Sequence, residues 1–309
     1  MRIAIIGAGA IGGFFGAKLA QAGHDVVFIA RGRHLQAMQS RGLTIRGDAD
    51  ETHLVPATAR ETTEGLAPVD AILFCVKLYD SEPAARACRP LLKDDTLVLT
   101  LQNGVESPDV LGAMLGRGRM LGGAAYIVVQ IEAPGVIRHT GPSERIEFAA
   151  ADPETGEDAA AFGAVCRQAG VDAHVGDDMR LLLWNKFVLL SASSSMTALT
   201  RRTMGWVRDD PVARETMIAA ITETVAVARA LGVPLADDIR PRTLEALDHV
   251  VGADAKASQL VDLERGKRLE LEWLSGAIHR FGRQTGVPTP VHSTVYAALR
   301  PFASGRSGG

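Results

Sequence analysis

Three glycines near the start of the chain have the spacing of a phosphate-binding turn. They lie in the run Gly7-Ala8-Gly9-Ala10-Ile11-Gly12, directly after the apolar residues 3–6. The first glycine permits a tight turn, the second lets the backbone approach a pyrophosphate, and the third lets a following helix pack closely. The free N–H groups and the positive dipole end of that helix would then face the phosphates. This run therefore predicts a dinucleotide-binding site.

Two arginines bear on the choice of dinucleotide. Arg31 and Arg33 follow a second apolar stretch, residues 25–29. Sites that prefer NAD place Asp or Glu at this point to bind the ribose 2′-hydroxyl, whereas arginine suits the 2′-phosphate of NADP. We therefore expect NADPH as the cofactor, with Arg31 at the 2′-phosphate. Whether Arg33 joins it is left open by the residues alone.

Two polar residues follow strands that we expect later in the first half. Lys77 follows the apolar residues 71–76, and Asn103 follows residues 96–101. The carboxyl ends of parallel strands line the cofactor side of such a sheet, so we expect Lys77 and Asn103 to belong to the cofactor site. A solvated lysine and a simple turn are the alternatives at these two positions.

A lysine inside a strongly apolar helical stretch is the candidate for catalysis. Lys186 is flanked by residues 181–184 and 187–190, all of which are apolar, and its only polar neighbour in this stretch is Asn185. Burying such a lysine is costly unless it faces a polar cleft, although a long side chain can also extend along the surface. An ammonium group can stabilise the oxyanion that forms when a carbonyl carbon accepts hydride, and can then protonate it. Helical spacing places Leu190 and Ser194 on the face of Lys186.

A second polar stretch follows at residues 258–272. Ser258 precedes Asp262 by four residues, and Glu270 and Glu272 come next without sharing a helical face. Carboxylates near the start of a helix are favoured even without a function. The chemistry of the residues does not decide between Glu270 and Glu272.

The elements that must position these residues fall into two halves. In the first half, apolar runs alternate with helical patterns, which is typical of a doubly wound, largely parallel sheet with antiparallel strands added late. We expect strands at residues 3–6, 25–29, 71–76, 96–101, 121–129, 136–139, 145–148 and 172–175, a hairpin insertion at 43–45 and 53–55, and a helix at 157–169.

The second half shows almost no strand pattern. Helical periodicity predicts helices at residues 181–199, 211–231, 241–250, 256–264 and 270–285. The expected fold is an α/β Rossmann domain at 1–176, then an all-α domain at 177–303 that binds substrate and offers a surface for a homodimer. Residues 304–309 form an expected disordered tail. Substrate would bind in the cleft between the two domains.

The composition limits the class of partner. A net charge of −3 without long runs of one sign gives no indication of nucleic acid or a membrane surface, and no apolar stretch is long enough to span a bilayer. The three cysteines lack metal-binding or disulfide spacing, so we expect free thiols and no metal. A strand beginning at the second residue leaves no room for a signal peptide, and we expect a cytoplasmic protein.

These residues together resemble the ketopantoate reductase (2-dehydropantoate 2-reductase) family over nearly the whole chain. The resemblance lies in residues 7–12, Arg31, Lys77, Asn103-Gly104, Pro134-Gly135, His139-Thr140-Gly141, Trp184-Asn185-Lys186-Phe187, Thr197-Ala198-Leu199, and Ser258 with Asp262, Gly266 and Glu270. It implies NADPH-dependent reduction of 2-dehydropantoate to (R)-pantoate, a step toward pantothenate and coenzyme A.

The resemblance also implies a role for each matching residue. Lys186 would be the general acid, and Glu270, rather than Glu272, would lie beside the nicotinamide ribose and the substrate. Ser258 would bind the substrate carboxylate. The cofactor would be held by residues 7–12, Arg31, Lys77 and Asn103.

One departure concerns the substrate pocket. Where the family presents asparagines four and eight residues after the lysine, this chain has Leu190 and Ser194, and Ala255 replaces a third asparagine. Each lost amide removes a hydrogen bond worth about 1–3 kcal/mol to a polar substrate. We expect a more apolar pocket than that of a dedicated pantoate-forming enzyme, with Ser194 among its substrate contacts.

Two other functions stay open at this point. The chain could reduce a different, less polar 2-keto acid, as Leu190 suggests. It could also be a non-catalytic NADP(H)-binding sensor, although a sensor would not explain the presence of both Lys186 and Glu270.

Overall fold

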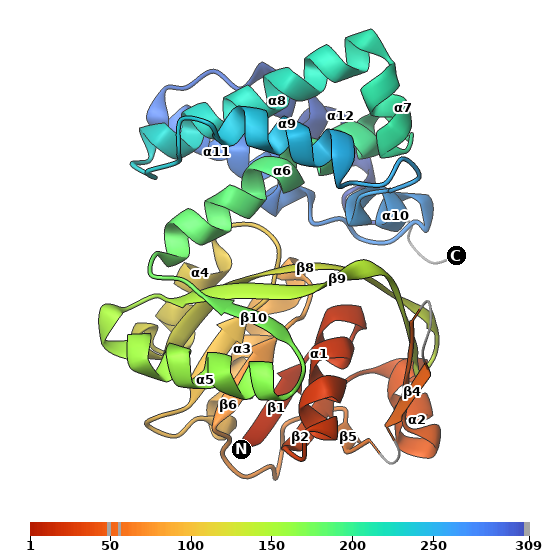
Figure 1. Ribbon diagram of the computed structural model, residues 1–309, viewed down its shortest axis with the longest axis vertical. Coiled ribbons are helices and arrows are strands. Elements are labelled where there is room, and N and C mark those ends of the chain that lie inside the picture. The colour runs from red at the N-terminus through yellow and green to blue at the C-terminus, as the bar shows by residue number, and fades with distance from the viewer. Residues whose placement is uncertain (48–50, 55–56, 306–309) are drawn as a thin grey trace. The chain divides into compact units, whose positions relative to one another are not determined.

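The computed structural model describes residues 1–47, 51–54 and 57–305, and the chain divides into two compact units, Met1–Leu182 and Leu183–Gly309. The division falls inside helix α6 (Met179–Thr200), shown with its label in Figure 1. Residue 55 of the expected strand 53–55 and residues 306–309 of the expected tail lie outside the described residues.

The first unit is built on one mixed sheet. Ten strands of the described residues form it, in the order β4-β3-β9-β8-β7-β6-β1-β2-β5, with β10 paired to β9. The strands are β1 (Arg2–Ile6), β2 (Asp25–Ile29), β3 (Leu43–Arg46), β4 (Glu51–Leu54), β5 (Ala59–Arg60), β6 (Ala71–Phe74), β7 (Leu97–Thr100), β8 (Met120–Ala133), β9 (Val136–Ala150) and β10 (Asp172–Val175). Neighbours from β5 to β8 pair in parallel, and β8 pairs with β9 in antiparallel fashion, as expected for a Rossmann sheet with later antiparallel additions.

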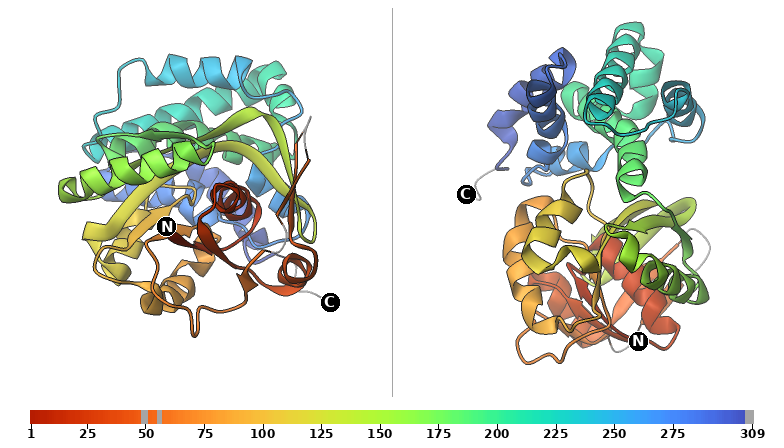
Figure 2. Two further views of the ribbon diagram at one scale, coloured as in Figure 1. Left: turned by 60° about the horizontal axis from the view of Figure 1, so that its bottom comes forward. Right: turned by 90° about the vertical axis from the view of Figure 1, so that its left-hand side faces the viewer.

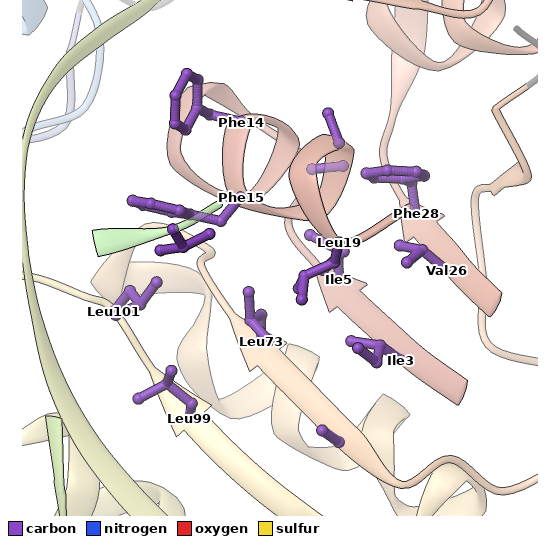
Figure 3. Packing of buried hydrophobic residues seen from close by; sticks show 14 of the residues in the cluster. Ile3, Ile5, Phe14, Phe15, Leu19, Val26, Phe28, Leu73, Leu99 and Leu101 are labelled. Atoms are coloured by element: carbon purple, nitrogen blue, oxygen red, sulfur yellow. The ribbon is translucent and has the colours of Figure 1, made fainter. Parts of the chain in front are cut away.

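Helices cover both faces of this sheet (Figure 2). They are α1 (Ala10–Gln21), α2 (Gly32–Arg41), α3 (Ser81–Cys88), α4 (Ser107–Leu115) and α5 (Gly156–Gln168). Because side chains alternate along a strand, Ile3 and Ile5 pack on one face of the sheet with Phe14 and Phe15 of α1 (Figure 3). Ala4 and Ile6 pack on the other face in the cluster that contains α3 and α4. Two-sided burial accounts for the continuous apolar runs of these strands.

The expected hairpin is present, and β3 pairs with β4 in antiparallel fashion. The expectation of two separate strands at 136–139 and 145–148 was wrong. Along the β8–β9 pairing, Ile127 faces Glu144 and Val128 faces Thr140, so residues 141–143 bulge from a single strand. The bulge includes Gly141 with φ +80°, a conformation that glycine adopts readily.

The second unit is helical throughout its described residues. After α6, its helices are α7 (Met204–Asp209), α8 (Pro211–Ala230), α9 (Ile239–His249), α10 (Ser258–Glu264), α11 (Ser275–Thr285) and α12 (Pro290–Leu299). Helix α8 packs against α7, α9, α11 and α12. The fold class expected from the sequence is therefore confirmed.

One expected helix is broken. Instead of a helix over 270–285, the chain forms a short 3₁₀ turn, η5 (Leu271–Trp273), and then α11. The break occurs at Leu274, whose φ of −107° and ψ of −102° lie outside the helical region, while its side chain is buried. Glu270 consequently lies at the start of a separate turn, not within a helix.

Candidate active site

The glycine run forms the turn between β1 and α1. Gly7 has φ +90°, and a Cβ there would lie 2.7 Å from the backbone nitrogen of Val76. A Cβ on Gly12 would lie 2.5 Å from the carbonyl oxygen of Gly7 and 2.8 Å from Cγ2 of Ile5. Both positions therefore require glycine, the first for the turn and the second for the close approach of α1 to β1.

Gly9 differs from its two neighbours in the motif because space is open beside it. It is the N-cap residue of α1, and a Cβ there would meet nothing within 4 Å. The N–H groups of Ala10 and Ile11 begin a helix whose first turn has no acidic residue, and first-turn N–H groups lack partners within the helix. Ala8 donates its N–H to the carbonyl of Ile29 at 2.8 Å, which ties the turn to β2. The turn fits a diphosphate, since it combines open space, N–H donors and a positive helix end.

Arg31 lies at the end of β2, where it is the N-cap residue of α2. Arg31 and Arg33 are both exposed, and neither guanidinium group makes a hydrogen bond or ion pair with any residue that the structure describes. The first turn of α2 carries no acidic residue. The end of β2 therefore presents two guanidinium groups without side-chain partners, and the first turn of α2 carries no carboxylate for a ribose 2′-hydroxyl.

Lys77 and Asn103 follow the carboxyl ends of two neighbouring parallel strands. The strands β6 and β7 pair with Phe74 opposite Thr100. Lys77 comes three residues after Phe74, as the N-cap of the turn η1 (Leu78–Asp80), and Asn103 comes three residues after Thr100. Both side chains are half-buried. Unit one thus brings the glycine turn, Lys77 and Asn103 to the same end of the sheet.

Gln102, directly before Asn103, has a buried side chain that no motif of the sequence singles out. Its side-chain amide donates to the carbonyl of Val76 at 2.9 Å and to the hydroxyl of Ser81 at 2.9 Å. A signal was present, because a polar amide directly after the apolar run 96–101 needs a partner when buried.

Lys186 occupies a half-buried position on α6, and its neighbours Trp184, Phe187 and Val188 are buried. Burial lowers the pKa of the Lys186 ammonium to about 8, and the Glu270 carboxylate opposes that shift. The pKa of Lys186 therefore lies close to neutral pH, where the side chain can both carry and release a proton.

The two glutamates of the 270–272 stretch have different surroundings. Glu270 is 7% exposed and acts electrostatically on Lys186. Glu272 is exposed, and it accepts hydrogen bonds from the Tyr296 hydroxyl at 2.6 Å and from Arg280 at 3.2 Å. The structure thus separates the two residues that the sequence could not, and it places Glu270 with the lysine.

The residues expected to contact the substrate differ in how deeply they are buried. Leu190 is half-buried, and Ser194 is fully buried with a hydroxyl that finds no hydrogen-bond partner among the described residues. Such a buried, unpartnered hydroxyl is uncommon and suits a ligand or a water molecule. Ser258 begins α10 and is exposed, and its hydroxyl makes no hydrogen bond to the described part of the chain. Unit two brings Lys186 and Glu270 together and does not show Ser258 in contact with either.

The described residues give no support to a metal site, a disulfide or a membrane-spanning helix. No group of three or more His, Cys, Asp or Glu side chains there could hold a metal ion. Cys75, Cys88 and Cys166 are free, and burial raises the pKa of each thiol to about 12. Within the same residues, every helix is too short or too polar to cross a membrane.

Comparison with known proteins covers both units. Residues 3–153 match the family described as "Ketopantoate reductase PanE/ApbA", and residues 178–303 match its C-terminal counterpart. A 2-dehydropantoate 2-reductase of Mesorhizobium japonicum is 34% identical over 98% of this chain and 98% of its own. The crystal structure of a PanE/ApbA family ketopantoate reductase from Ralstonia eutropha JMP134 superposes with a TM-score of 0.89 at 33% identity, covering 98% of each chain.

A third protein shares the fold alone. The structure of a D-mandelate dehydrogenase with NADH and anilino(oxo)acetate has a TM-score of 0.91 at 22% identity, over 98% of each chain. The family matches extend across both units, and the first relative covers nearly the full length. The chain is accordingly an oxidoreductase that belongs to the ketopantoate reductase family.

Proposed function

We propose that the chain catalyses the NADPH-dependent reduction of a 2-keto acid to a 2-hydroxy acid, with 2-dehydropantoate as substrate and (R)-pantoate as product. The observation that carries the proposal is the electrostatic pairing of Lys186 with the buried Glu270. A lysine with a pKa of about 8 is charged at neutral pH and releases its proton more readily than an ordinary lysine. The 34% identical relative named 2-dehydropantoate 2-reductase supports the choice of substrate.

The first unit supplies the cofactor site in this proposal. The N–H groups of residues 9–12 bind the diphosphate, and the uncommitted Arg31 binds the 2′-phosphate. Lys77 and Asn103 bind the nicotinamide half at the carboxyl ends of β6 and β7. When bound, NADPH supplies a hydride to the keto carbon of the substrate.

The second unit supplies the proton. The Lys186 ammonium donates a hydrogen bond to the keto oxygen, stabilises the negative charge that develops there, and transfers its proton to that oxygen. The Glu270 carboxylate favours the charged form of Lys186 against the effect of burial. The hydroxyls of Ser194 and Ser258 bind the polar groups of the substrate.

One observation favours a second substrate class. Leu190 takes the place of an amide one helical turn after Lys186, and a pocket lined there by leucine would accept a less polar 2-keto acid. The non-catalytic sensor finds less support, because it gives no reason for a lysine of lowered pKa beside a buried glutamate.

The test is an NADPH-oxidation assay with 2-dehydropantoate beside a panel of other 2-keto acids, repeated with NADH. We expect the highest kcat/KM with 2-dehydropantoate and NADPH. A kcat/KM for 2-dehydropantoate many decades below that of another acid would assign the less polar substrate. NADPH binding without turnover of any 2-keto acid would indicate a sensor.

The proposal includes a compartment and an assembly. Three free cysteines suit the reducing cytoplasm. A homodimer through the helical unit is supported by exposed apolar side chains on neighbouring helices, including Trp206 of α7 and Val212 of α8, which is 72% exposed. Light scattering measures the assembly directly, and a monomer at assay concentrations would contradict it.

A further inference from the structure

Gln102 joins the two segments that carry Lys77 and Asn103. It lies in the loop after β7, directly before Asn103, and its side chain is buried. The last main-chain hydrogen bond between the β6 and β7 segments, within the described residues, runs from the N–H of Leu101 to the carbonyl of Phe74 at 3.1 Å. Beyond that bond, the side chain of Gln102 connects the two segments through its hydrogen bonds to Val76 and Ser81.

Every part of the Gln102 amide is engaged. Its Nε2 donates to the carbonyl oxygen of Val76 at 2.9 Å and to Oγ of Ser81 at 2.9 Å. Its Oε1 accepts from the Thr100 hydroxyl at 3.1 Å. Because the Val76 carbonyl is only an acceptor, Nε2 must face it, and the orientation of the amide follows from the network.

These partners lie around Lys77. Val76 directly precedes the lysine, and Ser81 begins α3 after the short turn η1. The Gln102 amide therefore holds both ends of the segment that contains Lys77, while its own backbone continues into Asn103. A shift of the amide would change the separation of Lys77 and Asn103.

We propose that Gln102 is a positioning residue that sets the relative placement of Lys77 and Asn103 and so preorganises the site for a nicotinamide dinucleotide. The inference rests on the proposed function, which assigns Lys77 and Asn103 to the cofactor. Preorganised side chains bind with a smaller loss of conformational freedom, so the effect falls on cofactor affinity.

The first experiment measures NADPH binding to purified full-length protein by fluorescence titration. Gln102→Met keeps the approximate size of the side chain and removes all three hydrogen bonds. We expect its Kd for NADPH to rise about tenfold, which corresponds to 1.4 kcal/mol, because the loss of these bonds leaves Lys77 and Asn103 less preorganised. Gln39→Met is the matched control. Gln39 lies on α2 and its amide donates one hydrogen bond to the carbonyl of Ala59 at 3.0 Å, which involves neither the Lys77 nor the Asn103 segment. It should leave the Kd unchanged.

A double-mutant cycle separates positioning from a general structural role. If Gln102 acts through Lys77, then adding Gln102→Met to Lys77→Ala weakens NADPH binding by much less than tenfold. Full additivity of the two substitutions, or a wild-type Kd in Gln102→Met, would overturn the inference. Failure of the wild-type protein to bind NADPH would instead overturn the proposed cofactor.

A second variant covers the case in which Gln102→Met does not fold. Thr100→Val has nearly the same shape in β7. It removes the hydroxyl that donates to Oε1 of Gln102 at 3.1 Å and accepts from the Gln102 backbone N–H at 3.3 Å, and it leaves the two bonds of Nε2 in place. We expect a severalfold weaker Kd for NADPH in this variant, and a smaller effect in the Lys77→Ala background. An unchanged Kd in folded Thr100→Val would contradict the inference.

Discussion

The Glu270 carboxylate raises the pKa of the Lys186 ammonium, against a larger effect of burial that brings this pKa down to about 8. Lys186 lies on the long helix α6, whereas Glu270 precedes the turn η5, so two distant segments of the second unit create this balance. The carboxylate of Glu270 favours the charged form of Lys186 in its apolar surroundings, and burial lowers the pKa so that the ammonium group gives up its proton more readily.

The first prediction concerns Glu270→Gln. In the direction of reduction the protonated lysine is the acid, so activity falls as the pH rises through its pKa. Removal of the carboxylate removes the effect that raises this pKa, and the basic limb of the pH profile should move to lower pH. Profiles of kcat/KM test this, with Glu272→Gln as control because Glu272 is bound by Tyr296 and Arg280. A limb that stays in place in Glu270→Gln would disprove the coupling.

The second prediction concerns the proton donor itself. Lys186→Ala should lower kcat about 10²–10⁴-fold, the usual contribution of a general acid, while the Kd for NADPH stays near the wild-type value. The exposed Lys267→Ala serves as the control for loss of one positive charge from the same unit. Unchanged turnover in Lys186→Ala would remove the proposed mechanism.

Much of the first unit could be predicted because its strands are buried on both faces. The expected strand at 25–29 coincides with β2, since a short continuous apolar run with turn residues on either side has few other structures available. The expected strand at 172–175 coincides with β10, although only Ala173 in it is fully buried. The bulge in β9 could not be predicted. Residues 140–143 have the composition of a turn, and only their pairing with β8 shows that the strand continues.

The break at Leu274 also escaped prediction, because hydrophobic periodicity continues through a single residue that leaves the helical region. At the candidate site, the apolar residues on both sides of Lys186 single out the lysine from the sequence, and its role stays a prediction. The choice of Glu270 over Glu272 needed the family resemblance, since both are glutamates in one polar stretch. Their burial and their partners distinguish them, and those depend on the tertiary structure.

The third prediction addresses cofactor choice. Arg31→Ala should weaken NADPH binding at least tenfold and leave NADH binding nearly unchanged, because only NADPH carries the 2′-phosphate that a guanidinium can bind. Competition titrations with both dinucleotides provide the measurement. Arg86→Ala, which removes a surface arginine paired with Glu82 on α3, is the control. Equal losses for NADPH and NADH would exclude a contact between Arg31 and the 2′-phosphate.

The fourth prediction concerns stability and a buried histidine. His292 is fully buried, and burial lowers the pKa of its imidazole from 6.5 to about 4. Since the folded pKa is the lower one, the unfolded chain binds the extra proton first, and the free energy of unfolding should fall as the pH drops from about 6.5 to 4. The loss attributable to His292 is about 3 kcal/mol at 1.36 kcal/mol per pKa unit.

Urea unfolding at pH 7.5 and pH 5 measures this effect. His292→Gln should be less stable at pH 7.5, because the imidazole bonds Thr224 at 3.0 Å and the Ala220 carbonyl at 3.1 Å. Its further loss of stability between the two pH values should be smaller than that of the wild type. An equal pH-dependent loss in both proteins would show that His292 does not control the acid limb.

The fifth prediction decides between the two substrate classes through Leu190. Leu190→Asn introduces an amide one turn after Lys186, on the same side of α6, where it can hydrogen-bond a hydroxyl or carboxylate. We expect kcat/KM for 2-dehydropantoate to rise about tenfold and kcat/KM for 4-methyl-2-oxopentanoate to fall. The new amide can hydrogen-bond a polar substrate group, whereas an apolar substrate leaves the amide without a partner. Leu189→Asn is the matched control, because Leu189 is equally half-buried but lies about 100° away around the helix.

If Leu190→Asn changes kcat/KM for both substrates by the same factor, Leu190 does not line the pocket. The departure from the family pattern would then carry no information about the substrate, and 2-dehydropantoate would be favoured over the less polar acids.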